Sequence, residues 1–211
     1  MNRITLLISA SEEYWKLAEY SAPNKLEYCL RHGIAFTMRK HVRIGDPWGE
    51  RPKFMLEELE RMNDGDWLWF MGVDTLITNM TIDVRKFLGD DAPDLTIAKD
   101  VNGMNNDVFF LRKTESSIRF LREVLALNTK LPDDQEAMKQ VIEQGWLTVK
   151  FTPQEPFNSY LFDEYRFYRR HYPIAVKEGQ WEKGRFVLHM PGIPNARRYQ
   201  LMEKHLPDVV R

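Results

Sequence analysis

The chain has 211 residues, a length that suits one large domain or two small ones and allows a sizeable buried core. With 43% hydrophobic and 29% charged residues, its composition is that of a globular protein and argues against disorder. The net charge of −1, without a long basic run, excludes a nucleic-acid-binding footprint. The single cysteine, Cys29, excludes an internal disulfide and fits a reducing compartment.

No part of the sequence predicts contact with a membrane. Residues 1–9 contain too short an apolar run for a signal peptide. No stretch approaches the roughly 20 apolar residues that a membrane-spanning helix needs. We therefore expect a soluble protein without membrane insertion.

Strands and helices alternate through the first half of the chain. Short apolar runs predict strands at residues 4–8, 34–38 and 67–71, the last of which is too apolar to have a solvated face. Apolar residues at helical spacing predict helices at residues 23–31 and 52–62. This alternation predicts a parallel sheet of the α/β class.

The second half of the chain is less regular. Its predicted strands are residues 95–98, 108–111, 148–151 and 186–190. Its predicted helices are residues 114–127, with Thr114 as a cap, a helix that opens at Pro132 and Asp133, and the amphipathic end, residues 197–206. Because the sequence shows no repeat and no linker, we expect one domain over residues 1–211.

The stretch from residue 67 to residue 79 is the most informative for function. A buried strand that ends near an acidic residue places a carboxylate at the carboxyl edge of a sheet, where open α/β folds bind ligands. Asp74 is therefore a candidate ligand for Mg²⁺ or Mn²⁺, because hard cations prefer oxygen donors. The structural alternative is that Asp74 caps the following turn.

Other polar residues have strong structural alternatives when they are taken singly. His189 ends an apolar strand, where a histidine is more often hydrogen-bonded than metal-bound. The acidic residues at 133–136 fit the first turn of a helix, where they favour its dipole. Several basic residues could supply charge for a diphosphate, although scattered basic residues are usually solvated: Lys177, Lys183, Arg185, Arg197 and Arg198.

Taken in order, several stretches match the sequence blocks of one known family. They are residues 24–28 with 32–33, Trp48 with 52–53, 67–79, 104–112, 133–135, 157–160 and 181–192. The ordered set covers nearly the whole chain and resembles the GT-A glycosyltransferases. It is most similar to the galactosyl- and xylosyltransferase family typified by yeast mannan galactosyltransferases and plant xyloglucan xylosyltransferases. Residues 67–79 resemble the block of that family that contains its DxD motif.

The resemblance implies a fold and an activity. The fold is a Rossmann-like GT-A domain with a mostly parallel central sheet flanked by helices. Residues 1–112 would form its nucleotide-sugar-binding half and residues 113–211 its acceptor-binding half. The activity is metal-dependent transfer of a sugar from a nucleotide-sugar, with UDP as the expected nucleotide, to a hydroxyl of a glycan or glycoprotein acceptor, with retention of configuration.

The resemblance also implies roles for individual residues. Asp74 and His189 would hold Mn²⁺ or Mg²⁺, which would bridge the donor diphosphate and stabilise the leaving nucleoside diphosphate. Asp134 and Gln135 match the family's element beside the reacting sugar and are the expected catalytic residues. The loop at residues 9–14 is the expected nucleobase pocket. The full expected donor-binding set is Ser9, Ala10, Gly72, Val73, Asn105, Asp107 and Arg197.

The chain departs from the family pattern at three places. Gly72 stands where the first Asp of the DxD motif is expected, which puts metal dependence or donor affinity in doubt. Asp107 replaces a glycine and brings a carboxylate near the donor sugar, where it could bond sugar hydroxyls. The family's lysine after the metal-binding histidine is missing, and Arg197 or Arg198 could compensate.

Two other functions remain open at this point. Gly72 suggests a nucleotide-sugar-binding module with little transfer activity, although the presence of Asp74, His189 and the pair at 134–135 argues against it. A hydrolase of nucleotide sugars or phosphoesters would need a denser cluster of carboxylates and histidines. Family members in secretory organelles carry a membrane anchor. Because no apolar stretch of this sequence predicts such an anchor, we expect a cytoplasmic enzyme, in the host cytoplasm if the chain is viral, or a domain of a longer protein.

Overall fold

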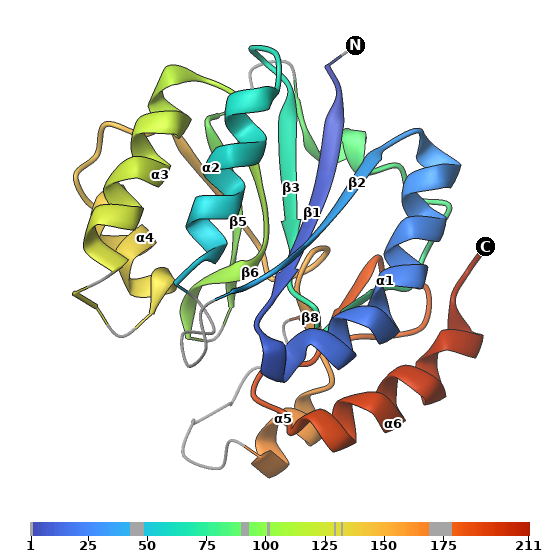
Figure 1. Ribbon diagram of the computed structural model, residues 1–211. Helices are drawn as coiled ribbons and strands as arrows, with labels where there is room; N and C mark the ends of the chain where they lie inside the picture. Colours follow the sequence, from blue (N-terminus) through green and yellow to red (C-terminus); the bar gives the residue numbers. More distant parts are fainter. Residues whose placement is uncertain are drawn as a thin grey trace.

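The computed structural model describes residues 2–42, 49–89, 93–100, 102–128, 130–131, 133–168 and 179–211. Trp48, Pro132 and Lys177, which the sequence analysis singled out, lie outside these ranges. The described chain contains a six-stranded sheet of order β2-β1-β3-β6-β5-β7 and a three-stranded sheet of order β4-β9-β8 (Figure 1).

The strands and helices have the following bounds. The large sheet consists of β1 (Ile4–Ala10), β2 (Ala35–Lys40), β3 (Trp67–Met71), β5 (Leu95–Asp100), β6 (Gly103–Arg112) and β7 (Val149–Thr152). The small sheet consists of β4 (Thr75–Ile77), β8 (Ser159–Tyr160) and β9 (Val187–His189). The helices are α1 (Glu12–His32), α2 (Arg51–Arg61), α3 (Glu115–Asn128), α4 (Asp134–Ile142), α5 (Phe162–Tyr168) and α6 (Asn195–His205), with short 3-10 turns at η1 (Val84–Phe87) and η2 (Leu206–Asp208).

The large sheet is mostly parallel, as expected. β1 pairs in parallel with β2 and β3, and β5 pairs in parallel with β7. β6 runs antiparallel to its neighbours β3 and β5. The sheet therefore brings the carboxyl ends of β1 and β3 and the beginning of β6 to one edge.

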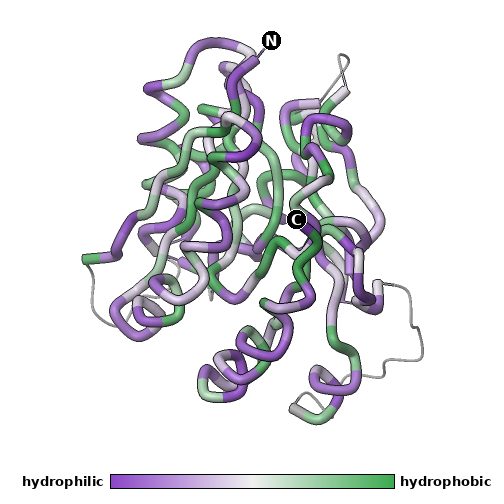
Figure 2. The backbone as a smooth tube through the Cα atoms, turned by 90° about the vertical axis from the view of Figure 1, so that its right-hand side faces the viewer, coloured by the Kyte–Doolittle hydropathy of each residue, from purple (hydrophilic) through white to green (hydrophobic). Residues whose placement is uncertain are grey.

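Alternate residues of the central strands pack on opposite faces of the large sheet. Leu7 packs with apolar residues of α2, α3 and α4, which cover one face. Leu6 and Ile8 pack on the other face with Tyr28 of α1 and with Val187 of the small sheet. Figure 2 shows the same arrangement, with hydrophobic strands inside and helices that alternate between polar and apolar residues outside.

Two elements begin earlier than the sequence predicted. α1 starts at Glu12 rather than at residue 23, and Pro23 lies inside it. Burial of Leu17 and Ala18 against the rest of the protein outweighs the hydrogen bond that proline removes from the helix. β6 starts at Gly103 rather than at residue 108, because an irregularity in β5 between Ile97 and Ala98 lets the hairpin continue.

Polar side chains of α1 attach this helix to the small sheet. Asn24 accepts a hydrogen bond from the backbone nitrogen of Ile77 at 2.8 Å and donates to the backbone oxygen of Ile77 at 2.9 Å. Lys25 is fully buried and donates to the backbone oxygen of Thr75 at 2.7 Å. These bonds fix β4, the strand that directly follows Asp74.

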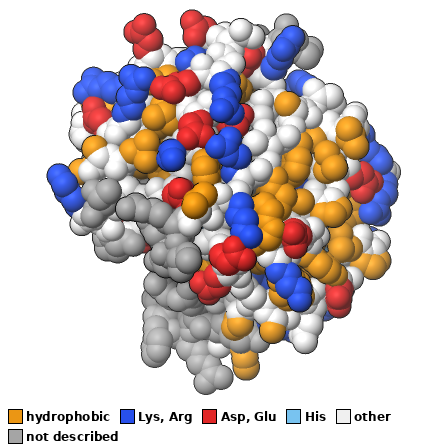
Figure 3. Space-filling model, viewed as in Figure 1, with side chains coloured by type: hydrophobic (Ala, Val, Ile, Leu, Met, Phe, Trp, Pro, Cys, Tyr) orange, Lys and Arg blue, Asp and Glu red, His pale blue; other side chains and the backbone are white. Residues whose placement is uncertain are grey.

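The described surface carries charges of both signs. On the face seen in Figure 3, acidic and basic side chains lie beside one another rather than in separate patches. Among the helices of the described residues, none is long and apolar enough to cross a membrane.

Candidate metal centre and donor cavity

A cavity of about 480 Å³ opens at the carboxyl ends of β1 and β3. Its walls come from the end of β1 and the start of α1, from the end of β3 and the turn after it, and from the segment between β9 and α6 with the start of α6. Arg51 of α2 and Asp107 of β6 complete the lining. Of the residues expected to bind a donor, those that line it are Ser9, Ala10, Gly72, Val73 and Asp107. The position agrees with the rule that open α/β sheets bind ligands beyond the carboxyl ends of their strands.

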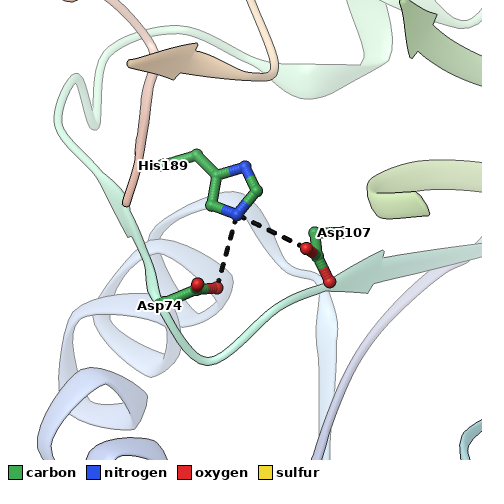
Figure 4. Close-up of side chains that lie close together, drawn as sticks. All are labelled: Asp74, Asp107 and His189. Atoms are coloured by element: carbon green, nitrogen blue, oxygen red, sulfur yellow. Dashed lines mark ion pairs between the residues drawn. The ribbon is translucent and has the colours of Figure 1, made fainter. Parts of the chain in front are cut away.

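Three side chains meet beside this cavity and could hold a metal ion; Asp74 and Asp107 line the cavity, and His189 is buried behind them. Asp74, Asp107 and His189 each offer one ligand atom, and these atoms lie within 4.8 Å of one another. The three residues come from the turn after β3, from β6 and from β9, and their side chains converge (Figure 4). His189 Nε2 lies 3.4 Å from an oxygen of Asp74 and 3.5 Å from an oxygen of Asp107.

Strand pairing places Asp74 and His189 together. β4 and β9 are antiparallel, and Thr75 is the direct partner of His189. The backbone nitrogen of Met190 also donates to the backbone oxygen of Asp74 at 3.0 Å. The expectation that these two residues share a site, drawn from positions far apart in the sequence, agrees with this geometry.

The charges of this group are strongly coupled to its surroundings. Burial lowers the pKa of His189, but the neighbouring carboxylates of Asp74 and Asp107 outweigh it and raise that pKa to about 9. Burial raises the pKa of Asp74, yet Arg198 and His189 hold it below its usual range. Burial also raises the pKa of Asp107, yet His189 and Arg51 hold it well below its usual range. Both carboxylates are therefore ionised at neutral pH, and the group attracts a cation or a proton.

The donor atoms fit a divalent cation. Two carboxylate oxygens and an imidazole nitrogen suit Mn²⁺, and the carboxylates also suit Mg²⁺. His189 Nε2 is buried and has no hydrogen-bond partner among the described residues, whereas His189 Nδ1 contacts Oδ1 of Asn158. A histidine that ligates a metal through one nitrogen and bonds an oxygen through the other is the usual arrangement.

Gly72 lies directly beside this group. Its backbone nitrogen donates to the backbone oxygen of Asp107 at 2.6 Å, so that the two residues extend the antiparallel register of β3 and β6. A Cβ atom at position 72 would lie 3.0 Å from an oxygen of Asp74 and 3.3 Å from the side chain of Asp107. The glycine therefore leaves the space that the carboxylate of Asp107 needs.

Arg51, at the start of α2, holds Asp107 in place. Its Nη1 lies 2.8 Å from an Asp107 oxygen, while Nε and Nη2 bond the carboxylate of Asp134. Burial lowers the pKa of Arg51, but Asp134 and Asp107 raise it well above its usual value. Sequence reasoning missed Arg51, because nothing in a lone arginine before Pro52 distinguishes it from surface charge.

The structure does not bring the two expected catalytic residues to the cavity. Asp134 is 0% exposed, bonds Arg51 and receives a hydrogen bond from Asn106 at 3.1 Å. Gln135 accepts a hydrogen bond from the backbone nitrogen of Asn106 at 3.2 Å. Neither residue lines the cavity, and Asp134 lies behind Arg51, which does. Asp134 therefore contacts the site through Arg51.

Of the two arginines considered as substitutes for a missing lysine, Arg198 reaches the site. Arg198 lines the cavity, and its Nη2 lies 2.7 Å from an oxygen of Asp74. Arg197 points elsewhere and pairs with Glu164 of α5. The two neighbours on α6 differ because successive helical residues point about 100° apart.

The remaining expected residues lie on either side of the metal group. Asn105 is behind it, where Oδ1 accepts from the backbone nitrogen of Asp107 at 3.0 Å. Ser9 and Ser11 line the cavity, and their buried hydroxyls have no hydrogen-bond partner among the described residues. Such buried hydroxyls are suited to a polar ligand. Tyr14 also lines the cavity, as expected for the loop at residues 9–14.

Comparison with known proteins identifies the family. A family described as nucleotide-diphospho-sugar transferase matches residues 61–184, more than half of the chain. The chain belongs to this family. The galactosyl transferase GMA12/MNN10 family also matches, over residues 3–92. The enzyme is thus a glycosyltransferase, and the resemblance drawn from the sequence blocks is confirmed.

Solved structures confirm the GT-A fold. A glycosyltransferase involved in glycosylation of the major capsid of PBCV-1 is similar, with a TM-score of 0.72, 16% identity, and coverage of 96% of this chain and 99% of that one. The galactosyltransferase LgtC, solved with donor and acceptor sugar analogues, has a TM-score of 0.54, 12% identity, and coverage of 95% and 96%. Drosophila β1,4-galactosyltransferase 7, a mutant solved with manganese, UDP-Gal and xylobiose, has a TM-score of 0.51, 13% identity, and coverage of 95% and 74%. A search of curated proteins gave no match.

Proposed function

We propose that this glycosyltransferase moves a sugar from a UDP-sugar to a hydroxyl of a glycan or glycoprotein, with retention of configuration and with Mn²⁺ or Mg²⁺ at Asp74, Asp107 and His189. The observation that carries the proposal is the convergence of these three side chains beside the cavity, two of which, Asp74 and Asp107, line it. Its support from relatives is that one similar structure, the Drosophila enzyme, is described with manganese and UDP-Gal.

The cavity offers distinct groups to the parts of such a donor. Ser9, Ser11 and Tyr14 would contact the nucleoside, because they line the cavity at and just after the end of β1. They offer two buried hydroxyls without a hydrogen-bond partner among the described residues and one aromatic ring. Arg198 would face the diphosphate, because its guanidinium lies in the cavity wall beside Asp74. A divalent cation at the three-residue group would supply Lewis-acid stabilisation of the leaving nucleoside diphosphate.

The protein's own residues prepare this site for charge. Arg51 keeps one oxygen of Asp107 occupied, so that the other oxygen faces His189. Arg198 neutralises part of the negative charge of Asp74 and would turn toward a bound diphosphate. Asp134 keeps Arg51 in position from behind. Together these contacts arrange the charges before the donor arrives, which is the usual source of electrostatic catalysis.

Calorimetric titration with UDP and UDP-sugars, with and without Mn²⁺, tests the proposal. We expect binding that requires Mn²⁺ and that falls at least tenfold in Asp74→Asn and in His189→Gln. Asp64→Asn is the matched control, because Asp64 is exposed in the turn that precedes β3, at the other end of this strand from Gly72 and Asp74, and the variant should bind as wild type.

Each alternative gives a different result. Tight binding of UDP-sugars that ignores Mn²⁺, together with an absence of sugar transfer, would favour a nucleotide-sugar-binding module. Release of free sugar without an acceptor, at a rate that acceptors do not change, would favour a hydrolase. No binding of any UDP compound would contradict the proposed donor class.

A further inference from the structure

Behind the metal group, polar side chains form a continuous chain of hydrogen bonds from Asp100 to His189. The hydroxyl of Tyr160 donates to Asp100 Oδ2. Asn158 Nδ2 donates to the Tyr160 hydroxyl oxygen at 3.2 Å, and Asn158 Oδ1 contacts Nδ1 of His189. Because Asn158, Tyr160 and His189 are each 0% exposed, the protein itself determines the direction of these bonds.

The direction of the chain follows from the carboxylate at its end. A carboxylate only accepts hydrogen bonds, and the Tyr160 hydroxyl accordingly donates to Asp100. The tyrosine oxygen must then accept, which turns the amide NH₂ of Asn158 toward Tyr160 and its oxygen toward His189. His189 Nδ1 must therefore carry a hydrogen, and in the neutral ring Nε2 keeps its lone pair.

A second branch fixes the same direction independently. The backbone nitrogen of Asp107 can only donate, and it donates to Asn105 Oδ1 at 3.0 Å. Asn105 Nδ2 consequently faces the Tyr160 oxygen at 2.9 Å and Asp100 Oδ2 at 3.1 Å. The amide nitrogens of Asn158 and Asn105 both face the Tyr160 oxygen and can only donate to it. Within this network, Asp100 is therefore the acceptor of the Tyr160 proton.

We infer that Asp100 is a positioning residue that sets the tautomer of His189, so that the Nε2 lone pair faces the space between Asp74 and Asp107. Nothing in the family resemblance assigned a role to this carboxylate. The part of the inference that concerns metal affinity rests on the proposed function, whereas the part that concerns the tautomer does not.

An aspartate is needed at position 100 because both of its oxygens accept. Oδ1 accepts from the backbone nitrogen of Asn102 at 2.6 Å, and Oδ2 accepts from Tyr160 and Asn105. An asparagine has one oxygen and would turn its NH₂ either toward a backbone N–H or toward Tyr160. In the second case the tyrosine proton would point at Asn158, whose amide would flip and offer NH₂ to His189.

The experiment compares Asp100→Asn and Tyr160→Phe with wild type by two readouts. Electron paramagnetic resonance of free Mn²⁺ gives metal affinity, and we expect a loss of about 10- to 100-fold, the usual effect of removing a group that orients a ligand. Nitrogen-15 NMR of histidine-labelled, metal-free protein, recorded above the pKa of His189, gives the tautomer. We expect the Nδ1–H form in wild type and a large share of the Nε2–H form in both variants.

Tyr165→Phe is the matched control. It removes a hydroxyl from a neighbouring buried tyrosine whose ring centroid lies 5.4 Å from that of Tyr160. Its hydroxyl accepts from Asn102 at 2.9 Å and is not part of the chain to His189. We expect wild-type metal affinity and the wild-type tautomer in this variant.

A rescue separates the proposed role from packing. In Asn158→Asp, a carboxylate accepts from His189 Nδ1 whatever Tyr160 does, so adding Tyr160→Phe or Asp100→Asn should cost less than threefold in Mn²⁺ affinity. The inference would be overturned if Tyr160→Phe or Asp100→Asn lowered Mn²⁺ affinity as much in the Asn158→Asp protein as in wild type. It would also be overturned if the two single variants kept the wild-type tautomer of His189. If wild type fails to bind Mn²⁺, the proposed function fails, and the NMR comparison alone decides the role of Asp100.

Discussion

At the scale of single residues, the sequence predicted two of the three members of the candidate metal group and placed the third, Asp107, near the donor sugar. Asp74 follows a strongly apolar strand and His189 ends one, but only the family resemblance singled them out as ligands, and their proximity in the structure depends on one strand pairing. Arg51 and Asn158 gave no such signal, because their roles depend on contacts with residues 83 and 31 positions away. Asp134 was expected at the reacting sugar, yet its partner Arg51 occupies the cavity wall instead.

Metal affinity should depend on pH through His189. Its pKa is raised to about 9, and Mn²⁺ must displace the proton from Nε2. Affinity should therefore rise about tenfold per pH unit from pH 6 toward 9 and then level off. Titration of Mn²⁺ at fixed ionic strength checks this, and a flat profile would mean that His189 is not a ligand.

The same shift has the opposite consequence for the metal-free protein. A pKa raised from 6.5 to about 9 means that protonated His189 contributes stability that is fully present below pH 6.5. That contribution is lost as pH rises through 9. As pH rises from 6.5 through 9, the free energy of unfolding of His189→Gln should therefore fall less than that of wild type. Urea unfolding at a series of pH values measures both.

At the scale of elements, the register of β3 and β6 explains how the candidate metal group can form although Gly72 carries no carboxylate. Positions 72 and 107 lie opposite each other in the antiparallel pair, so a carboxylate on either can point to the same space. Sequence reasoning saw both departures from the family pattern but could not see that they are neighbours. The predicted strand began at residue 108, so it left out residues 103–107 of β6 and with them the position that lies opposite Gly72.

Exchange of the two residues tests this explanation. Gly72→Asp should crowd Asp74 and Asp107, and Asp107→Gly should remove a ligand, so each should weaken Mn²⁺ binding at least tenfold. The double variant Gly72→Asp/Asp107→Gly should recover most of the affinity. Calorimetry measures all three, and a double variant as weak as the product of the single ones would contradict the explanation.

The link between α1 and β4 is a second element-scale feature with a measurable role. Asn24→Ala would leave the backbone N–H and C=O of Ile77 buried without their partner. We expect a loss of about 2–4 kcal/mol in the free energy of unfolding. The exposed Asn63→Ala should change it by less than about 0.5 kcal/mol. If Asn24→Ala and Asn63→Ala changed the free energy of unfolding in urea by the same amount, the hydrogen bonds between α1 and β4 would not contribute to stability.

At the scale of the whole molecule, the alternation of strands and helices was enough to predict a parallel α/β sheet, and the family resemblance of the sequence blocks added the GT-A fold. The small sheet was not predictable, because β4, β8 and β9 are two or three residues long and pair across the chain. This sheet joins the first half of the chain to the second. We therefore do not expect the two parts divided at residue 112 to fold separately, and the proposed donor site also uses His189 and Arg198 from the second part.

A fragment of residues 1–112 should accordingly fail to fold as a unit. It would lack β7, β8 and β9, and it would leave Phe110 and Leu76 without the apolar partners that now bury them. We expect no cooperative thermal transition and no Mn²⁺ binding. A sharp transition by circular dichroism would show that the first half is an independent domain.

The most direct test of the central claim is to detect the imidazole nitrogen on bound Mn²⁺. Electron spin-echo envelope modulation of the Mn²⁺-loaded protein should show coupling to a histidine nitrogen. The signal should disappear in His189→Gln and persist in His205→Gln, because His205 lies outside the metal group. Bound Mn²⁺ without nitrogen coupling in wild type, or with coupling that survives in His189→Gln, would contradict a metal centre at Asp74, Asp107 and His189.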